Sequence, residues 1–116
     1  MFVTAFVLLI LCDLPWLYAT SAYSSRMITK IQGSPLRFSL WPAVIVYLAL
    51  AFLMTKMKSA KEAFCFGVAT YAVYDFTTLA IFKEYDPIFA VADSLWGGVL
   101  FYAVKTILDK WIIGPM

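Results

Sequence analysis

Residues 71–98, YAVYDFTTLAIFKEYDPIFAVADSLWGG, decide the fold of this chain. Two apolar runs flank a polar turn at 83–86, and the turn ends in Asp86-Pro87, a helix N-cap followed by a proline at the first helical position. The stretch therefore predicts two antiparallel helices joined by a tight connection. Each apolar run also contains one aspartate, Asp75 or Asp93, although a carboxylate at the centre of a membrane-spanning helix costs roughly 2.5–3.5 kcal/mol.

The composition of the whole chain extends this pattern to four helices. The chain has 116 residues, of which 64% are hydrophobic and 14% charged, whereas soluble domains carry about 25% charged residues. The apolar residues fall into four blocks separated by short segments that hold most of the charge. We predict an all-α polytopic membrane protein, an up-down bundle of four transmembrane helices forming one domain over 1–116. The predicted helices cover residues 2–22, 35–55, 60–82 and 87–108.

Local signals place the ends of these helices. Ser59 and Glu62 have the spacing of a capping box and mark the start of the third helix. Ser34-Pro35 marks the start of the second helix. The basic segment that ends at Gly33 either extends the first helix or lies at the membrane interface, and the glycine is expected to cap it.

The residue inventory disfavours several classes of function. The chain has no histidine, the commonest general base and metal ligand, and no zinc-type spacing. Cys12 and Cys65 both lie in apolar blocks, so we expect buried free thiols rather than a disulfide. The net charge of +2 is too small to indicate nucleic-acid binding. We therefore expect no cofactor, no metal and no nucleic-acid partner, and enzymatic activity is disfavoured, although acid–base chemistry by two carboxylates stays open. No basic residue precedes the first apolar run, which argues against a cleaved signal peptide.

Three intramembrane aspartates are predicted to lie at nearly the same depth. Counting from the turn between the third and fourth helices places Asp75 and Asp93 both about 10 Å into the bundle. Asp13 comes slightly deeper from the same side, beside a kink or weakened turn expected at Pro15. The three carboxylates can form one layer if their helices turn those faces inward.

Aromatic and polar residues accompany the aspartates at helical spacing. The pattern Asp-x-x-Trp occurs twice, as Asp13 with Trp16 and as Asp93 with Trp96. Glycine beside the second tryptophan would allow close approach of a helix or a ligand. The proposed polar layer comprises Asp13, Trp16, Tyr71, Tyr74, Asp75, Thr78, Asp93, Trp96 and Gly97.

Two interpretations of this layer remain open. It is either a site for protons, cations or amines, or a hydrogen-bonded polar core that fixes helix register. The first favours a small oligomeric transport or binding protein. The second favours an accessory structural subunit of a larger membrane complex, and a lipid-binding or lipid-modifying protein is a third alternative. Expected partners are membrane lipids, further copies of the chain, or other subunits. Five basic residues against four favour both termini on the inner side.

Several short runs resemble one known family. The runs YAVYDFTTLA at 71–80, DSLWG at 93–97 and DLPWL at 13–17, with Pro42 followed by Tyr47, are similar to the motifs of a family of small membrane proteins catalogued as domain of unknown function 2177. The resemblance implies four spanning helices and no assigned activity. It also implies an asparagine more often than a threonine at the position of Thr78. The residues that it places in the shared pattern are Asp13, Tyr74, Asp75, Asp93, Trp96 and Gly97.

Overall fold

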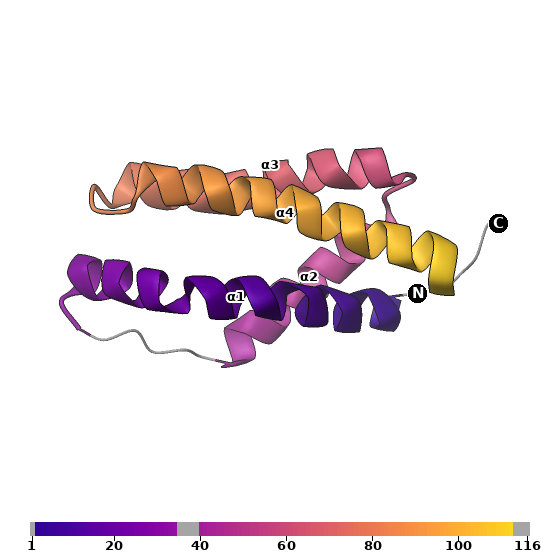
Figure 1. Cartoon of the computed structure of the whole chain (residues 1–116), viewed down its shortest axis with the longest axis horizontal. Helices are drawn as coiled ribbons and strands as arrows, with labels where there is room; N and C mark the ends of the chain where they lie inside the picture. The colour runs from indigo at the N-terminus through magenta and orange to yellow at the C-terminus, as the bar shows by residue number, and fades with distance from the viewer. Residues whose placement is uncertain (1, 35–39, 113–116) are drawn as a thin grey trace.

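The chain folds into four helices and a short terminal π-helical turn. The structure is a computed structural model, and it describes residues 2–34 and 40–112. Within these residues there is no strand, and the elements are α1 (Phe2–Gln32), α2 (Leu40–Thr55), α3 (Ala60–Ile81), α4 (Pro87–Ile107) and η1 (Leu108–Ile112). The predicted all-α, four-helix fold is confirmed (Figure 1).

The caps form at the positions that the sequence indicated. Asp86 Oδ1 accepts a hydrogen bond from the Ile88 amide at 2.8 Å, and Pro87 occupies the first turn of α4. At α3, Ser59 Oγ accepts from the Glu62 amide at 3.1 Å. The return bond of the expected capping box differs by one residue, because Glu62 Oε1 accepts from the amide of Lys58 rather than from that of Ser59.

The lengths of α1 and α2 differ from the predicted ranges. α1 continues ten residues past residue 22, runs through Pro15, and ends where Gly33, at φ 74°, donates to the Thr29 carbonyl. It continues because Met27 on this segment packs against Tyr85 beyond α3. The described part of α2, Leu40–Thr55, spans about 24 Å, which is less than a hydrocarbon core of about 30 Å. The predicted start at Ser34-Pro35 falls partly on residues 35–39, outside the described residues.

The helices lie along one long axis, with α2 crossing obliquely behind the others (Figure 1). α4 packs antiparallel to α3 along most of its length, and it also contacts α1, which runs antiparallel to it. The bundle is about 50 Å long, close to the thickness of about 40–45 Å of a bilayer with its headgroups. Helices α1 and α3 and the segment Pro87–Lys110 are each long and apolar enough to cross a membrane.

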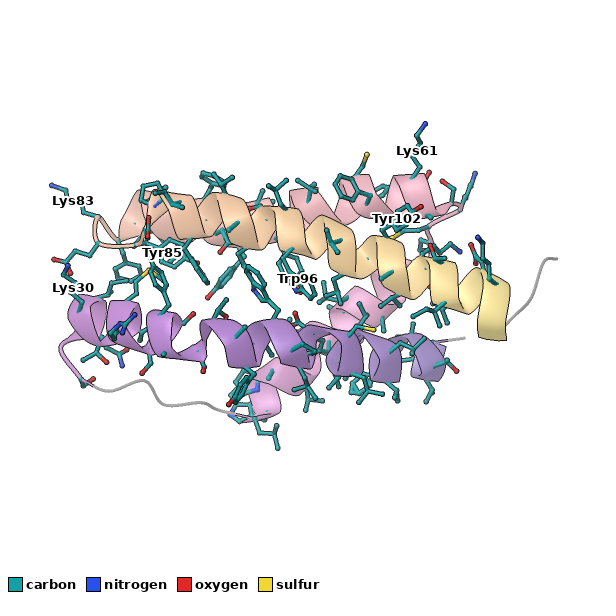
Figure 2. The ribbon with its side chains drawn as sticks, in the orientation of Figure 1. Lys30, Lys61, Lys83, Tyr85, Trp96 and Tyr102 are labelled. Carbon is teal, nitrogen blue, oxygen red and sulfur yellow. The ribbon has the colours of Figure 1, made fainter. Side chains whose placement is uncertain are left out.

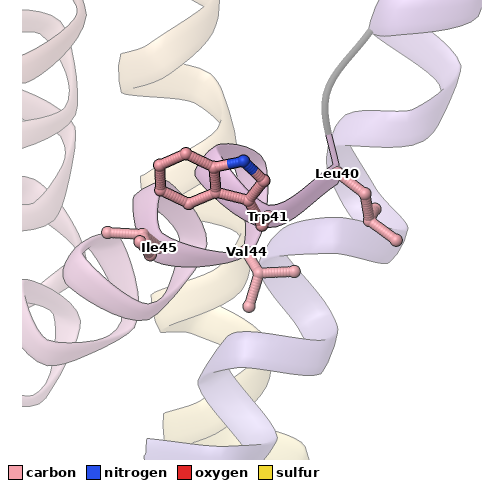
Figure 3. A pocket seen from close by; sticks show the side chains of 4 residues that line it. All are labelled: Leu40, Trp41, Val44 and Ile45. Atoms are coloured by element: carbon pink, nitrogen blue, oxygen red, sulfur yellow. The ribbon is translucent and has the colours of Figure 1, made fainter.

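Close packing of α3 on α4 brings the two aspartates of the opening stretch together. Gly67 lies against the backbone of α4, where an added Cβ would overlap the carbonyl oxygen of Gly97. The apolar core lies towards the end of the bundle away from the α3–α4 turn, and includes Leu9, Met54 and Phe101. Elsewhere many large apolar side chains are exposed, as expected of lipid-facing surfaces. At the start of α2 they border an open apolar pocket of about 630 Å³ that includes Trp41 (Figure 3).

Candidate functional site

Two aspartate–tryptophan pairs join α1 to α4 by exchanging hydrogen bonds. Trp16 Nε1 donates to Asp93 Oδ1 at 2.9 Å, and Trp96 Nε1 donates to Asp13 Oδ1 at 2.7 Å. The two indoles stack between the helices, with centroids 5.2 Å apart and planes at 9°. We call these four residues the indole clasp. The repeated Asp-x-x-Trp motif is therefore one contact made twice.

The exchange follows from the spacing and from the helix direction. Residues three apart lie on one helix face about 4.5 Å apart along the axis. Because α1 and α4 are antiparallel, Trp16 comes level with Asp93, and Trp96 comes level with Asp13. The two aspartates of the clasp therefore differ in depth by about one helical turn, as the sequence count suggested.

Asp13 has donors on both of its carboxylate oxygens. In addition to the bond from Trp96 to Oδ1, Tyr47 of α2 donates its hydroxyl to Oδ2. The side chain is 3% exposed. A buried carboxylate with both oxygens satisfied connects three helices and needs no ligand to complete it. Its arrangement fits the interpretation of a structural polar core.

Asp75, in contrast to Asp13, receives a donor from the described residues on only one of its carboxylate oxygens. Its side chain is fully buried, and Oδ1 accepts from the Tyr85 hydroxyl at 2.6 Å, whereas no donor among the described residues reaches Oδ2. The neighbouring polar group is the carboxyl of Asp93, which lies within hydrogen-bonding reach. An ionised carboxylate only accepts hydrogen bonds, so two of them satisfy each other only when one carries a proton. We call these two residues the carboxyl pair.

Tyr71 lies among all of these groups. The charges of the three aspartates and the Tyr47 hydroxyl all act on its own hydroxyl, which makes no hydrogen bond within the described part of the chain. Its ring packs edge-on against Phe101, at 6.3 Å between centroids. The ring also covers Gly97, where an added Cβ would overlap it. Tyr71 therefore supplies an uncommitted donor at the centre of the layer, and the predicted glycine provides room for its ring.

Two of the predicted residues do not join the layer. Tyr74 is 63% exposed and makes no side-chain hydrogen bond among the described residues. Thr78 donates its hydroxyl to the Tyr74 carbonyl within α3, at 2.8 Å, instead of reaching an aspartate. The structure therefore brings together seven of the nine proposed residues, namely Asp13, Trp16, Tyr71, Asp75, Asp93, Trp96 and Gly97.

The predicted polar layer did not include two tyrosines that donate hydrogen bonds to its aspartates, Tyr85 and Tyr47. Tyr85 lies in the turn between α3 and α4, yet it is only 3% exposed and packs edge-on against Phe89 at 6.0 Å. Burial raises the pKa of the Tyr85 hydroxyl above its ordinary value, and the hydrogen bond to Asp75 raises it further, so the hydroxyl keeps its proton and donates. Tyr47, in the strongly apolar α2, could have been suspected as a partner because a buried tyrosine hydroxyl usually needs one.

One buried charge lies apart from the layer. Lys105, near the end of α4, is 6% exposed and forms an ion pair of 3.0 Å with Asp109 one turn later. No group of three or more potential metal ligands occurs in the described parts of the chain, and Cys12 and Cys65 are free thiols. Acid–base groups and aromatic donors are therefore the chemistry that this layer offers.

Three apolar helices of spanning length and a buried carboxylate layer define the class: a small polytopic integral membrane protein. The comparison with protein families agrees. The family described as predicted membrane protein (DUF2177) matches residues 1–108, and the chain belongs to this family. No curated protein and no solved structure matches the chain significantly.

Proposed function

We propose that this protein is a small transport protein that takes up a proton or a small cation at the carboxyl pair, Asp75 and Asp93. The observation that carries the proposal is the fully buried Asp75 Oδ2, which receives no donor from the described residues and lies beside a second carboxyl. Intramembrane acids that face other protein groups are characteristic of proton and ion pathways. A proton between the two carboxyls would satisfy the open oxygen and leave the pair with a single negative charge.

The burial of Asp75 favours a small occupant. Its Oδ2 atom is fully buried beside the acidic group of Asp93 and offers no exposed surface to an amine, whereas a proton needs no space of its own. A compact cation such as Na⁺ would need further oxygen ligands, and the Tyr71 hydroxyl, which makes no hydrogen bond among the described residues, could supply one. The proton is therefore the occupant that we favour.

A route to the carboxyl pair begins at the end of the bundle that holds the α3–α4 turn. A surface pocket of about 370 Å³ is lined in part by Tyr85, whose hydroxyl contacts Asp75. Beyond Asp93 the stacked indoles of Trp16 and Trp96 lie between α1 and α4, and the apolar core follows. This arrangement supports access from one side only, and release to the other side requires the indole clasp to open.

Proton flux into proteoliposomes that contain the purified protein tests this proposal. We expect acidification driven by an imposed potential in the wild type, and its loss in Asp75→Asn and in Asp93→Asn. Glu62→Gln is the matched control, because it also converts a carboxylate to an amide, far from the pair, and a capping box accepts glutamine. Flux that persists in both aspartate variants, or that is absent from the wild type under all ion gradients, would overturn the proposal.

The part of the layer whose carboxylate oxygens already have donors favours a second candidate function. In this function the protein is an accessory subunit of a larger membrane complex. Asp13 and the indole clasp hold three helices together without any ligand. Native mass spectrometry of gently solubilised protein distinguishes the candidates. A subunit should emerge with stoichiometric partners, whereas a lone chain or a homo-oligomer would count against this candidate.

A further inference from the structure

A second site lies at the membrane surface, at the end of the bundle that holds the α3–α4 turn. The late part of α1 and that turn border the open pocket of about 370 Å³. Three basic side chains line it, with Arg26 and Lys30 on α1 and Lys83 on the turn. Figure 2 shows Lys30 and Lys83 projecting from the two elements at this end of the bundle, near Tyr85.

The basic side chains of the pocket are available to a ligand. Within the described parts of the chain, none of the three forms an ion pair, although two acidic residues line the same pocket. One of these, Asp86, already uses an oxygen to cap α4. The other, Glu84, is exposed and makes no hydrogen bond to any residue that the structure describes. Three cations against two carboxylates leave a positive surplus at a membrane surface.

The floor of the pocket is held in place by contacts between α1 and the turn. The Asp86 amide donates to the sulfur of Met27 at 3.3 Å, which joins the turn to α1. Tyr23 stacks on Phe89 at 5.6 Å between centroids, and Phe89 in turn contacts Tyr85. The basic side chains therefore project from a packed base, so the backbone that carries them is already in place before a ligand binds.

We propose that this pocket binds the phosphate of an anionic phospholipid headgroup. Arg26 supplies a planar fork that matches phosphate oxygens, and Lys30 and Lys83 supply point charges from two sides. The pocket opens at the end of helices that span the membrane, where phosphates lie, and Tyr23 has the amphipathic character of residues at that level. The carboxyl pair takes no part in this binding, although the pocket is also the one from which the proposed route to that pair begins.

Lipid retention measured by native mass spectrometry tests the proposal. The protein is purified into mixed micelles containing equal amounts of phosphatidylglycerol and phosphatidylcholine. We expect one phosphatidylglycerol to stay bound to the wild type in preference to phosphatidylcholine. The triple variant Arg26→Gln/Lys30→Gln/Lys83→Gln should lose that preference by roughly 100-fold, since each basic residue near a membrane contributes about 1 kcal/mol.

A matched control and an opposite perturbation make the test specific. Lys56→Gln/Lys58→Gln/Lys61→Gln removes the same charge at the other end of the bundle and should keep the bound lipid. Glu84→Gln, which removes a carboxylate from the pocket, should raise retention several-fold, a gain that damage to the fold cannot produce. Asp75→Asn should leave retention unchanged.

Three outcomes would overturn the proposal. One is equal loss in the two triple variants, which would indicate a non-specific basic flank. Another is a wild type that retains no phosphatidylglycerol, or that retains both lipids equally. The third is a result in which millimolar inorganic phosphate displaces the lipid and binds the pocket as tightly as the lipid does. That result would identify a soluble phosphate as the ligand.

Discussion

Replacing Asp75 by asparagine should leave the fold intact or stabilise it, even though the residue is fully buried. In the variant, the amide oxygen keeps the bond from Tyr85, and the amide NH₂ takes the place of Oδ2 beside Asp93. Asparagine thereby imitates an Asp75 that holds the proton of the pair, with a donor that cannot dissociate. Compared with a pair in which both carboxyls are ionised, the variant gains one hydrogen bond to a charged group, which corresponds to about 1.5–3 kcal/mol, less any loss of fit. Compared with a pair that already shares a proton, the variant should be about as stable.

The same substitution at Asp13 should have the opposite sign. Both of its oxygens accept, from Trp96 and from Tyr47, so the NH₂ of an asparagine would face a group that donates. One bond to a charged acceptor is lost and a buried donor is left unsatisfied. The expected loss is about 2 kcal/mol of unfolding free energy. Tyr47 can turn to accept from the amide, but its own proton then loses its acceptor.

Unfolding in mixed micelles of rising denaturing-detergent content measures both variants. Tryptophan fluorescence follows the transition, because two of the four tryptophans form the indole clasp. Unfolding free energies should rank Asp75→Asn at or above the wild type and Asp13→Asn below it. Equal destabilisation by the two substitutions would refute the reasoning, since it would mean that the open oxygen of Asp75 is satisfied by a donor in the membrane.

Three further predictions concern the contacts around the layer. Trp16→Phe and Trp96→Phe should each abolish the excitonic signal that the stacked indoles give in circular dichroism, and each should lower the unfolding free energy by about 1–3 kcal/mol by leaving a carboxylate oxygen without its donor. Gly67→Ala should destabilise by about 1–3 kcal/mol and loosen α3 from α4, measured by cross-linking between the helices, because its Cβ has no room at the facing carbonyl. The raised pKa of Tyr85 means that its contribution to stability is complete below pH about 10 and is lost at higher pH, as the unfolded chain gives up this proton more readily. Tyr85→Phe should remove part of that alkaline loss in an unfolding–pH profile.

Helix pattern and depth were accessible from the sequence because they depend on periodicity and on rise per residue. The capped start of α4 and the near-equal depth of Asp75 and Asp93 follow from counting alone. The exchange of hydrogen bonds within the indole clasp could not be predicted from the sequence. It requires α1 to lie next to α4, antiparallel to it, with the face that carries Asp13 and Trp16 turned towards α4. Chain order links each helix to the next one and leaves the partner of α1 open.

Tyr74 on α3 was predicted to lie in the layer but is exposed, and the reason is geometric. A helix turns about 100° per residue, so Tyr71 lies about 40° from the direction of Asp75, whereas Tyr74 lies about 100° away. The i, i+3, i+4 pattern that grouped them describes a broad stripe, and only part of the stripe faces α4. Tyr85 was missed for a different reason. A residue in a turn is expected at the surface, but here its long side chain reaches back into the bundle to Asp75.

A count of donors separates the three aspartates more clearly than depth or burial does. Their six carboxylate oxygens receive four side-chain donors from the described residues: Trp96 and Tyr47 to Asp13, Trp16 to Asp93, and Tyr85 to Asp75. The shortfall of two falls on Asp75 and Asp93, the carboxyls that lie within reach of each other. A single proton between these two groups would fill both openings at once. The same layer can therefore hold the helices through Asp13 and still accept a proton at the carboxyl pair.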